Sequence, residues 1–230
     1  MFNVGQYWNP KQALLKQNLK ECKIEEVKLQ LYELHSVVHS SNIYETQIQS
    51  YLDEIFNGLN DTEFRIMPPK HNATIAWNVW HITRIEDLTT NILIANSEQV
   101  LDTEWLDRMR VDIKDTGNAM SDEEIISFSR NISLQELRNY RNAVGNKTKQ
   151  IIEDLKKEDL KRKFEQTQVN KILDVGGVTE HPQSKWLLDF WGKKTVAGIL
   201  LMPITRHQIV HLNDCSKIKD KCSKMCMHGK

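Results

Sequence analysis

Apolar residues recur at intervals of three and four along four segments of the chain, the spacing that places them on one face of an α-helix. These segments span residues 24–39, 72–96, 133–155 and 194–219. Pro203 lies inside the fourth segment and should kink or loosen one turn, because it has no amide hydrogen to donate. Strand-like alternation is nearly absent. The pattern therefore predicts an all-α protein with four principal helices.

Sequence signals at helix starts predict shorter helices between the principal ones. Ser121 precedes Glu124 by three residues and Ser133 precedes Glu136 by three, so each pair can form a capping box. Short helices are expected at residues 46–59, 121–130 and 184–191. Because the connections between the principal helices are long, the pattern favours a helical bundle with long crossing connections over one joined by tight hairpins.

The composition is that of a folded protein with a large core: 230 residues, 40% hydrophobic and 27% charged. A single domain over residues 1–230 accounts for this length, with a mobile lysine-rich tail expected from about residue 220. Lysine plus arginine equals aspartate plus glutamate at 31 each, so no net field attracts nucleic acid or an anionic membrane. Since no apolar run is long enough for a signal peptide or a membrane span, we predict a cytoplasmic protein.

Three polar side chains occupy inward positions of the fourth predicted helix: His207, His211 and Asp214. Each unpartnered polar group would cost about 1–3 kcal/mol on burial, so partners are expected. His207 and His211 are four residues apart and share a helix face, which allows them to chelate one ion. His81, at an inward position of the second helix, can supply a third imidazole. Such a set suits zinc, nickel, copper or iron and leaves a coordination position open, with Asp214 as a hydrogen-bond partner of a ligating histidine.

The same spacing occurs at His35 and His39, but the prediction there is different. Each follows a residue of the apolar stripe, Leu34 or Val38, and so lies about 100° away from that stripe on the helix. We therefore predict that this second pair lies on a solvated flank. For His81 taken alone, a hydrogen-bonded core histidine is the alternative interpretation.

Other polar and aromatic residues also have two interpretations. Arg84 follows His81 by three residues and Arg141 lies on the inward face of the third helix, so either is a candidate to hold an anionic group of a substrate. The alternative is an arginine whose head extends outward to solvent. Trp77 and Trp80 precede His81 by four residues and one residue, and both are expected to pack in the core.

The cysteines do not suggest a disulfide framework. Cys22 stands alone, and the other three crowd the C-terminus, so reduced thiols are expected. Cys215, Cys222, Cys226 and His228 could form a thiolate-rich metal site, but their spacing matches no common zinc module. A disordered tail is the preferred interpretation.

Two motifs carry a family resemblance. Residues 77–87 (WNVWHITRIED) and 205–211 (TRHQIVH) resemble the DinB superfamily of damage-inducible, YfiT-like bundles. The likeness follows helix order over most of the chain, although only these two motifs are specific. It implies a four-helix bundle of up-down-down-up topology, often dimeric, whose second helix supplies one histidine and whose last helix supplies a His-x-x-x-His pair to a divalent metal. Those ligands match His81, His207 and His211.

The resemblance is less specific about chemistry. Characterised relatives include transferases and isomerases that use low-molecular-weight thiols such as bacillithiol or mycothiol. We therefore predict a divalent-metal-dependent enzyme acting on a small molecule, with one ion of zinc, nickel or iron and a thiol as co-substrate, although the same site could activate water for hydrolysis. Two alternatives stay open: a metal- or small-ligand-binding protein without turnover, and a structural bundle whose histidines bond one another and Asp214.

Overall fold

The computed structural model describes residues 4–228, and the side chains of residues 5–224 within them. In that part of the chain every regular element is a helix, apart from one isolated β-bridge between Lys163 and Thr195. The all-α prediction is confirmed.

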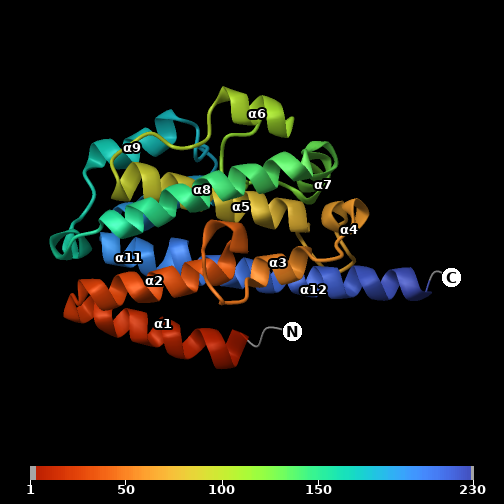
Figure 1. Cartoon of the computed structure of the whole chain (residues 1–230). Coiled ribbons are helices and arrows are strands. Elements are labelled where there is room, and N and C mark those ends of the chain that lie inside the picture. Colours follow the sequence, from red (N-terminus) through yellow and green to blue (C-terminus); the bar gives the residue numbers. More distant parts are fainter. Residues whose placement is uncertain (1–3, 229–230) are drawn as a thin grey trace.

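The core is built from the four segments whose periodicity predicted long helices. They are α2 (Ile24–Val38), α5 (Ile75–Asp87) with its continuation η2 (Leu88–Ile94), α8 (Leu134–Asp154), and α12 (His207–His228) preceded by α11 (Val196–Leu201) and η4 (Met202–Arg206). Helix α5 packs against α8 on one side and α12 on the other, and α2 also contacts both of those helices (Figure 1). The predicted stripes face this core: on α2, for example, Val27, Leu31, Leu34 and Val38 are fully buried.

Two of the long helices contain a widened π-helical turn. Pro203 lies in the turn η4, as the sequence predicted, and its carbonyl accepts a hydrogen bond from Gln208 Nε2 at 3.2 Å. The second π turn, η2, continues α5. There the hydroxyls of Thr89 and Thr90 donate to the carbonyls of Ile85 and Glu86, each at 2.6 Å. These contacts satisfy carbonyls at the points where the regular helical ladder changes.

Helix α1 (Val4–Glu21) lies along α2 at the edge of the molecule (Figure 1) and was not predicted from the sequence. Its buried residues Trp8, Leu15 and Leu19 are spaced by seven and four, which is a helical spacing, but Pro10 and a mostly polar composition weaken the pattern. Gln12 joins α1 to α11, since its amide donates to the Leu201 carbonyl at 2.9 Å.

Shorter helices fill the connections. They are η1 (Ser41–Ile43), α3 (Tyr51–Phe56), α4 (Asp61–Arg65), α6 (Thr103–Met109), α7 (Asp122–Asn131), η3 (Lys157–Lys161), α9 (Gln166–Asp174) and α10 (Pro182–Gly192). The capping box predicted at Ser121 and Glu124 is present. At α8 only half of the predicted box forms: Ser133 accepts from the Glu136 amide, but the Glu136 carboxylate accepts from Arg108 Nε at 2.7 Å instead.

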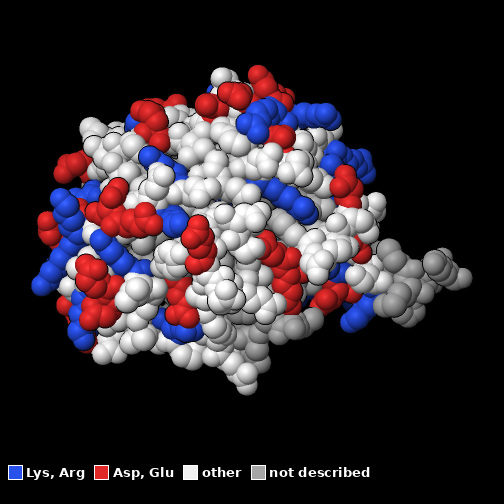
Figure 2. Space-filling view, viewed as in Figure 1, with Lys and Arg blue, Asp and Glu red and all other residues white. Residues whose placement is uncertain are grey.

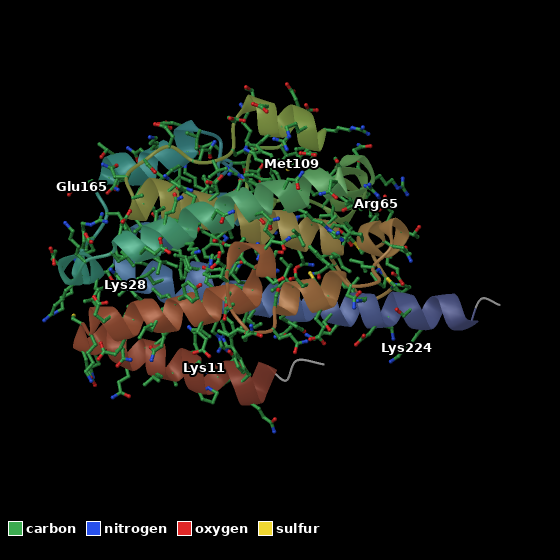
Figure 3. All side chains as sticks on the ribbon, in the orientation of Figure 1. Lys11, Lys28, Arg65, Met109, Glu165 and Lys224 are labelled. Carbon is green, nitrogen blue, oxygen red and sulfur yellow. The ribbon has the colours of Figure 1, made fainter. Side chains whose placement is uncertain are left out.

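Lysine and arginine side chains tie these connections to the core helices. Lys28 Nζ on α2 donates to the Glu153 carbonyl near the end of α8 at 2.7 Å, and Arg65 on α4 donates to the Ile132 carbonyl after α7 at 3.0 Å (Figure 3). Charges of both signs are interspersed over the face shown in Figure 2.

The C-terminal segment is helical, and the mobility expected from about residue 220 stays a prediction. Helix α12 continues to His228, and the Cys222 side chain is buried. The side chains of Cys226 and His228, which belong to the thiolate-rich site considered above, lie outside the described residues. Across the described residues, the helices fall short of the length and apolarity needed to cross a membrane.

Candidate metal centre

His81 is held by α5 in a single ring orientation. The side chain is buried, and its Nδ1 lies 2.7 Å from the Thr116 carbonyl oxygen, to which it donates a hydrogen bond. The Trp77 ring stacks on the imidazole with centroids 4.7 Å apart and an interplanar angle of 10°. Because the proton of the neutral ring is on Nδ1, Nε2 carries a lone pair directed at His207, and this lone pair can bind a cation in place of that contact.

His207 and His211 present their rings to His81 from α12. The Nε2 atoms of His81 and His207 are 3.2 Å apart, and one ring nitrogen from each of the three histidines lies within 4.8 Å of the other two. His211 and His81 have ring centroids 4.7 Å apart. The structure thus brings together the three histidines that the sequence singled out.

Asn78 fixes the third ring. Its Oδ1 accepts from His211 Nδ1 at 2.7 Å, while its Nδ2 donates to the Thr74 carbonyl at 2.8 Å, which sets the orientation of the amide. His211 therefore also carries its proton on Nδ1 and has a free lone pair on Nε2. Carbonyl and amide acceptors of this kind orient ligating histidines in metal sites.

Burial keeps the three rings neutral. It lowers the pKa of His81 to about 3 and that of His211 to about 4, and it holds the pKa of His207 well below its usual value. The nearby imidazoles lower the pKa values of His81 and His207 further. Neutral imidazole is the form that binds a divalent cation, so the donor set fits such an ion at neutral pH.

The centre is not sealed from solvent. His207 and His211 are only partly buried, and Val210 between them on α12 is 43% exposed. Three protein nitrogens leave a coordination position for water or another small ligand. This arrangement is typical of an open metal site and unlike a closed structural zinc site with four protein ligands.

Asp214 does not have the role predicted for it. Its carboxylate is 44% exposed and pairs with Lys217 Nζ at 2.8 Å on the outer side of α12. The acceptor for His211 is Asn78 instead. Asn78 stands three residues before His81 on the same inward stripe, so the sequence did contain a signal for it. The Thr116 carbonyl is a backbone group, and no sequence signal marks it.

Arg84 lies in the core, away from any substrate. The side chain is fully buried, and its guanidinium donates to Asp87 and Tyr140 at 2.8 Å and to the Lys114 carbonyl and Gln99 at 2.9 Å. These contacts contradict both the predicted substrate contact and the outward alternative. The Arg84–Asp87 pair fastens α5 to α8 through Tyr140.

Arg141 on α8 is also buried. It donates to the Val38 carbonyl at 2.8 Å, to Gln208 Oε1 at 2.9 Å and to Thr83 Oγ1 at 3.1 Å. Its contacts therefore link α2, α5 and α12 in the core, and its contact with an anionic substrate stays a prediction. Gln208 follows His207 directly, so Arg141 braces the turn that carries a candidate ligand.

The two tryptophans have separate roles. Trp80 is fully buried and its Nε1 donates to the Asp115 carbonyl at 3.0 Å, in agreement with the core position predicted for it. Trp77 is only partly buried and covers the His81 ring.

The prediction of a solvated flank at His35 and His39 is wrong. Both side chains are fully buried and contact the carboxylate of Glu86 on α5. Glu86 on α5, Tyr44 after η1 and Gly145 on α8 cover the two rings, so this flank of α2 is buried in addition to its apolar stripe. The apolar stripe alone did not reveal this extra cover.

Comparisons with known proteins agree with the geometry. The family model of the DinB superfamily matches residues 46–215, about three quarters of the chain, including His81, His207 and His211. Helix α1 and the whole of α2 precede the match. A search of curated proteins found no match.

Proposed function

Because the chain belongs to the DinB superfamily, we propose that it is a divalent-metal-dependent enzyme acting at an open site formed by His81, His207 and His211. The observation that carries the proposal is the approach of the His81 and His207 Nε2 atoms to 3.2 Å, with the Nδ1 atom of His81 already bonded to a carbonyl. A cation is the ligand that best satisfies nitrogen lone pairs directed at a common point.

The reaction proposed is transfer involving a low-molecular-weight thiol, with hydrolysis as the related possibility. Imidazole donors suit zinc, nickel or iron. When bound, such an ion supplies Lewis acidity that lowers the pKa of a coordinated thiol or water. The chain's own contribution is to orient His81 through Thr116, orient His211 through Asn78, and cover one side of the site with Trp77.

The remaining parts of the proposal concern architecture and setting. We propose that α2, α5, α8 and α12 form the up-down-down-up bundle of the family; the mutual contacts of these helices support it. A small-molecule substrate, a homodimer and a cytoplasmic location complete the proposal, which includes neither a nucleic-acid nor a membrane partner. Mixed surface charge supports the exclusion of nucleic acid.

The first experiment uses cobalt as the probe metal in the full chain. A small thiol that binds the ion should add a sulfur-to-cobalt charge-transfer band. His81→Ala should remove the band, and His71→Ala, which changes a histidine outside the cluster, should retain it. Activated electrophiles are then offered with bacillithiol, mycothiol, glutathione or coenzyme A, and metal-dependent conjugation is measured.

The second candidate function is metal or small-ligand binding without turnover. The match to a family and a partly buried site are compatible with it. Metal uptake that depends on His207 and His211, with no thiol band and no conjugation with any of the four thiols, would replace the enzyme proposal with this one. No metal uptake at all would contradict both.

A further inference from the structure

A second cluster of potential ligands lies in the core, between α2 and α5. His35 Nε2 is 2.8 Å from Glu86 Oε1, and His39 Nε2 is 2.9 Å from Glu86 Oε2. The two histidines are four residues apart on α2, and their ring centroids are 4.0 Å apart. All three side chains are completely buried. Two imidazoles and one carboxylate thus meet at a single point that solvent does not reach.

The separations within this cluster are close to those of a metal coordination shell. Zinc binds imidazole nitrogen and carboxylate oxygen at about 2.0–2.1 Å, so tetrahedral ligands lie roughly 3.3 Å from one another. The His35–Glu86 and His39–Glu86 distances need to grow by only about half an ångström to admit an ion of that size. The 3.2 Å separation of His81 and His207 is similar.

The surroundings hold the two rings in place. The Tyr44 hydroxyl contacts His35 Nδ1, the atom through which an outer partner orients a ligating imidazole. Gly145 on α8 lies against His39, where a Cβ atom would be 2.5 Å from Nδ1. His39 Nδ1 has no hydrogen-bond partner among the described residues. A larger residue than glycine at this point would displace the ring.

The cluster contains one acidic side chain, Glu86, and lies near one basic side chain, Arg141. Burial, the neighbouring His35 and the Arg141 guanidinium lower the pKa of His39 to about 3, although Glu86 opposes the shift. Burial would raise the pKa of Glu86, but His39 and His35 hold it well below its usual value. Arg141 is the charged group that faces the cluster from α8.

From this geometry we propose that His35, His39 and Glu86 form a second divalent-metal site, separate from the three-histidine centre and structural in role. A carboxylate that binds through both oxygens would complete four coordination positions without water. Because no open position remains and no solvent reaches the cluster, the ion would join α2 to α5 and enter during folding. Zinc fits this set of nitrogen and oxygen donors, and it suits a structural role because it has no redox chemistry.

The test is the number of zinc ions bound after refolding. The full chain is unfolded with chelator, refolded with excess zinc, dialysed and analysed for zinc. We expect two equivalents in the unaltered chain, one in His207→Ala/His211→Ala, and none when Glu86→Gln is added to that double variant. His71→Ala should keep two equivalents. Circular dichroism checks that each variant is helical.

A second measurement covers the case in which Glu86→Gln fails to fold. The His207→Ala/His211→Ala protein, which retains the buried cluster, is refolded with zinc or with chelator, and its melting temperature is compared. A bound structural ion should raise Tm. The proposal would be overturned if the double variant folds, binds no zinc and has the same Tm after refolding with zinc as after refolding with chelator. The cluster would then be a hydrogen-bonded His–Glu–His group. That outcome would not bear on the proposal for the three-histidine centre, because metal binding there is measured in the unaltered chain.

Discussion

Asn78 Oδ1 accepts a hydrogen bond from His211 Nδ1 at 2.7 Å, and this contact joins α5 to the last helix beside the candidate metal centre. Asn78→Leu should remove the acceptor while retaining a buried side chain. Loss of such an outer partner typically lowers metal affinity by about 10–100-fold. Competition titration with a chromophoric chelator measures the change.

Asp214→Ala is the matched control for Asn78→Leu. Its carboxylate pairs with Lys217 and not with a histidine, so metal affinity should stay within about twofold of the unaltered protein, as for an ordinary exposed ion pair. Equal losses in the two variants would show that Asn78 does not act through His211.

The metal-free protein should lose stability as the pH falls below neutrality. The pKa values of His81 and His211 in the folded protein, about 3 and about 4, are lower than the usual 6.5, so from pH 6.5 down to about 4 the unfolded chain binds protons that the folded chain does not. Each ring should then lower the free energy of unfolding by up to about 1.4 kcal/mol per pH unit. Urea denaturation with chelator present, at pH 7 and pH 5, measures this. His81→Gln should reduce the slope with pH, and an unchanged slope would contradict the assignment.

Arg141→Met should destabilise the fold. The change removes the donors to the Val38 carbonyl and Gln208 and leaves Glu86 without its nearby cation, and breaking a buried charge arrangement of this kind typically costs about 3–5 kcal/mol. The free energy of unfolding from denaturant titration measures it. Arg206→Met, at an exposed position, should change stability by less than about 0.5 kcal/mol. A stable Arg141→Met protein with weakened thiol binding would instead support the substrate role predicted for Arg141.

Gly145→Ala reports on the close contact between α8 and His39. Alanine in a helix interior normally gains about 1 kcal/mol over glycine, but here its Cβ would lie 2.5 Å from His39 Nδ1 and 2.7 Å from Ile43 Cδ1. Overpacking typically costs about 1–3 kcal/mol, so net destabilisation is expected. Gly192→Ala, where the nearest atom is at 3.4 Å, is the control for thermal denaturation. A higher Tm for Gly145→Ala would mean that the neighbouring side chains can shift to accommodate the added methyl group.

The sequence predicted the long helices and the three-histidine cluster because both depend on local periodicity. His81, His207 and His211 occupy inward positions of their stripes, and the family resemblance implied that His81 joins the other two in one ligand set. The same reasoning failed for His35 and His39. An apolar stripe identifies only the face that packs against apolar neighbours, whereas the flank that carries the two histidines is covered by Glu86 of α5, Tyr44 and Gly145 of α8.

Partners contributed by distant backbone could not be predicted either. The Thr116 carbonyl reaches His81 from a connection whose path no periodicity describes, and the choice of Asn78 over Asp214 depends on how α5 and α12 are rotated about their axes. That rotation is set by packing across the core, not by spacing along either helix.

The π turn at Met202–Arg206 adjusts the phase between the two halves of the last helix. Upstream, the Leu201 carbonyl is held by Gln12 of α1; downstream, His207 and His211 face α5. One residue of an α-helix corresponds to about 100° of rotation. A chain shortened by one residue in this turn could keep either the contact of Leu201 with α1 or the position of the two imidazoles opposite His81, but not both. The length of this single turn therefore couples the N-terminal helix to the orientation of the candidate metal ligands.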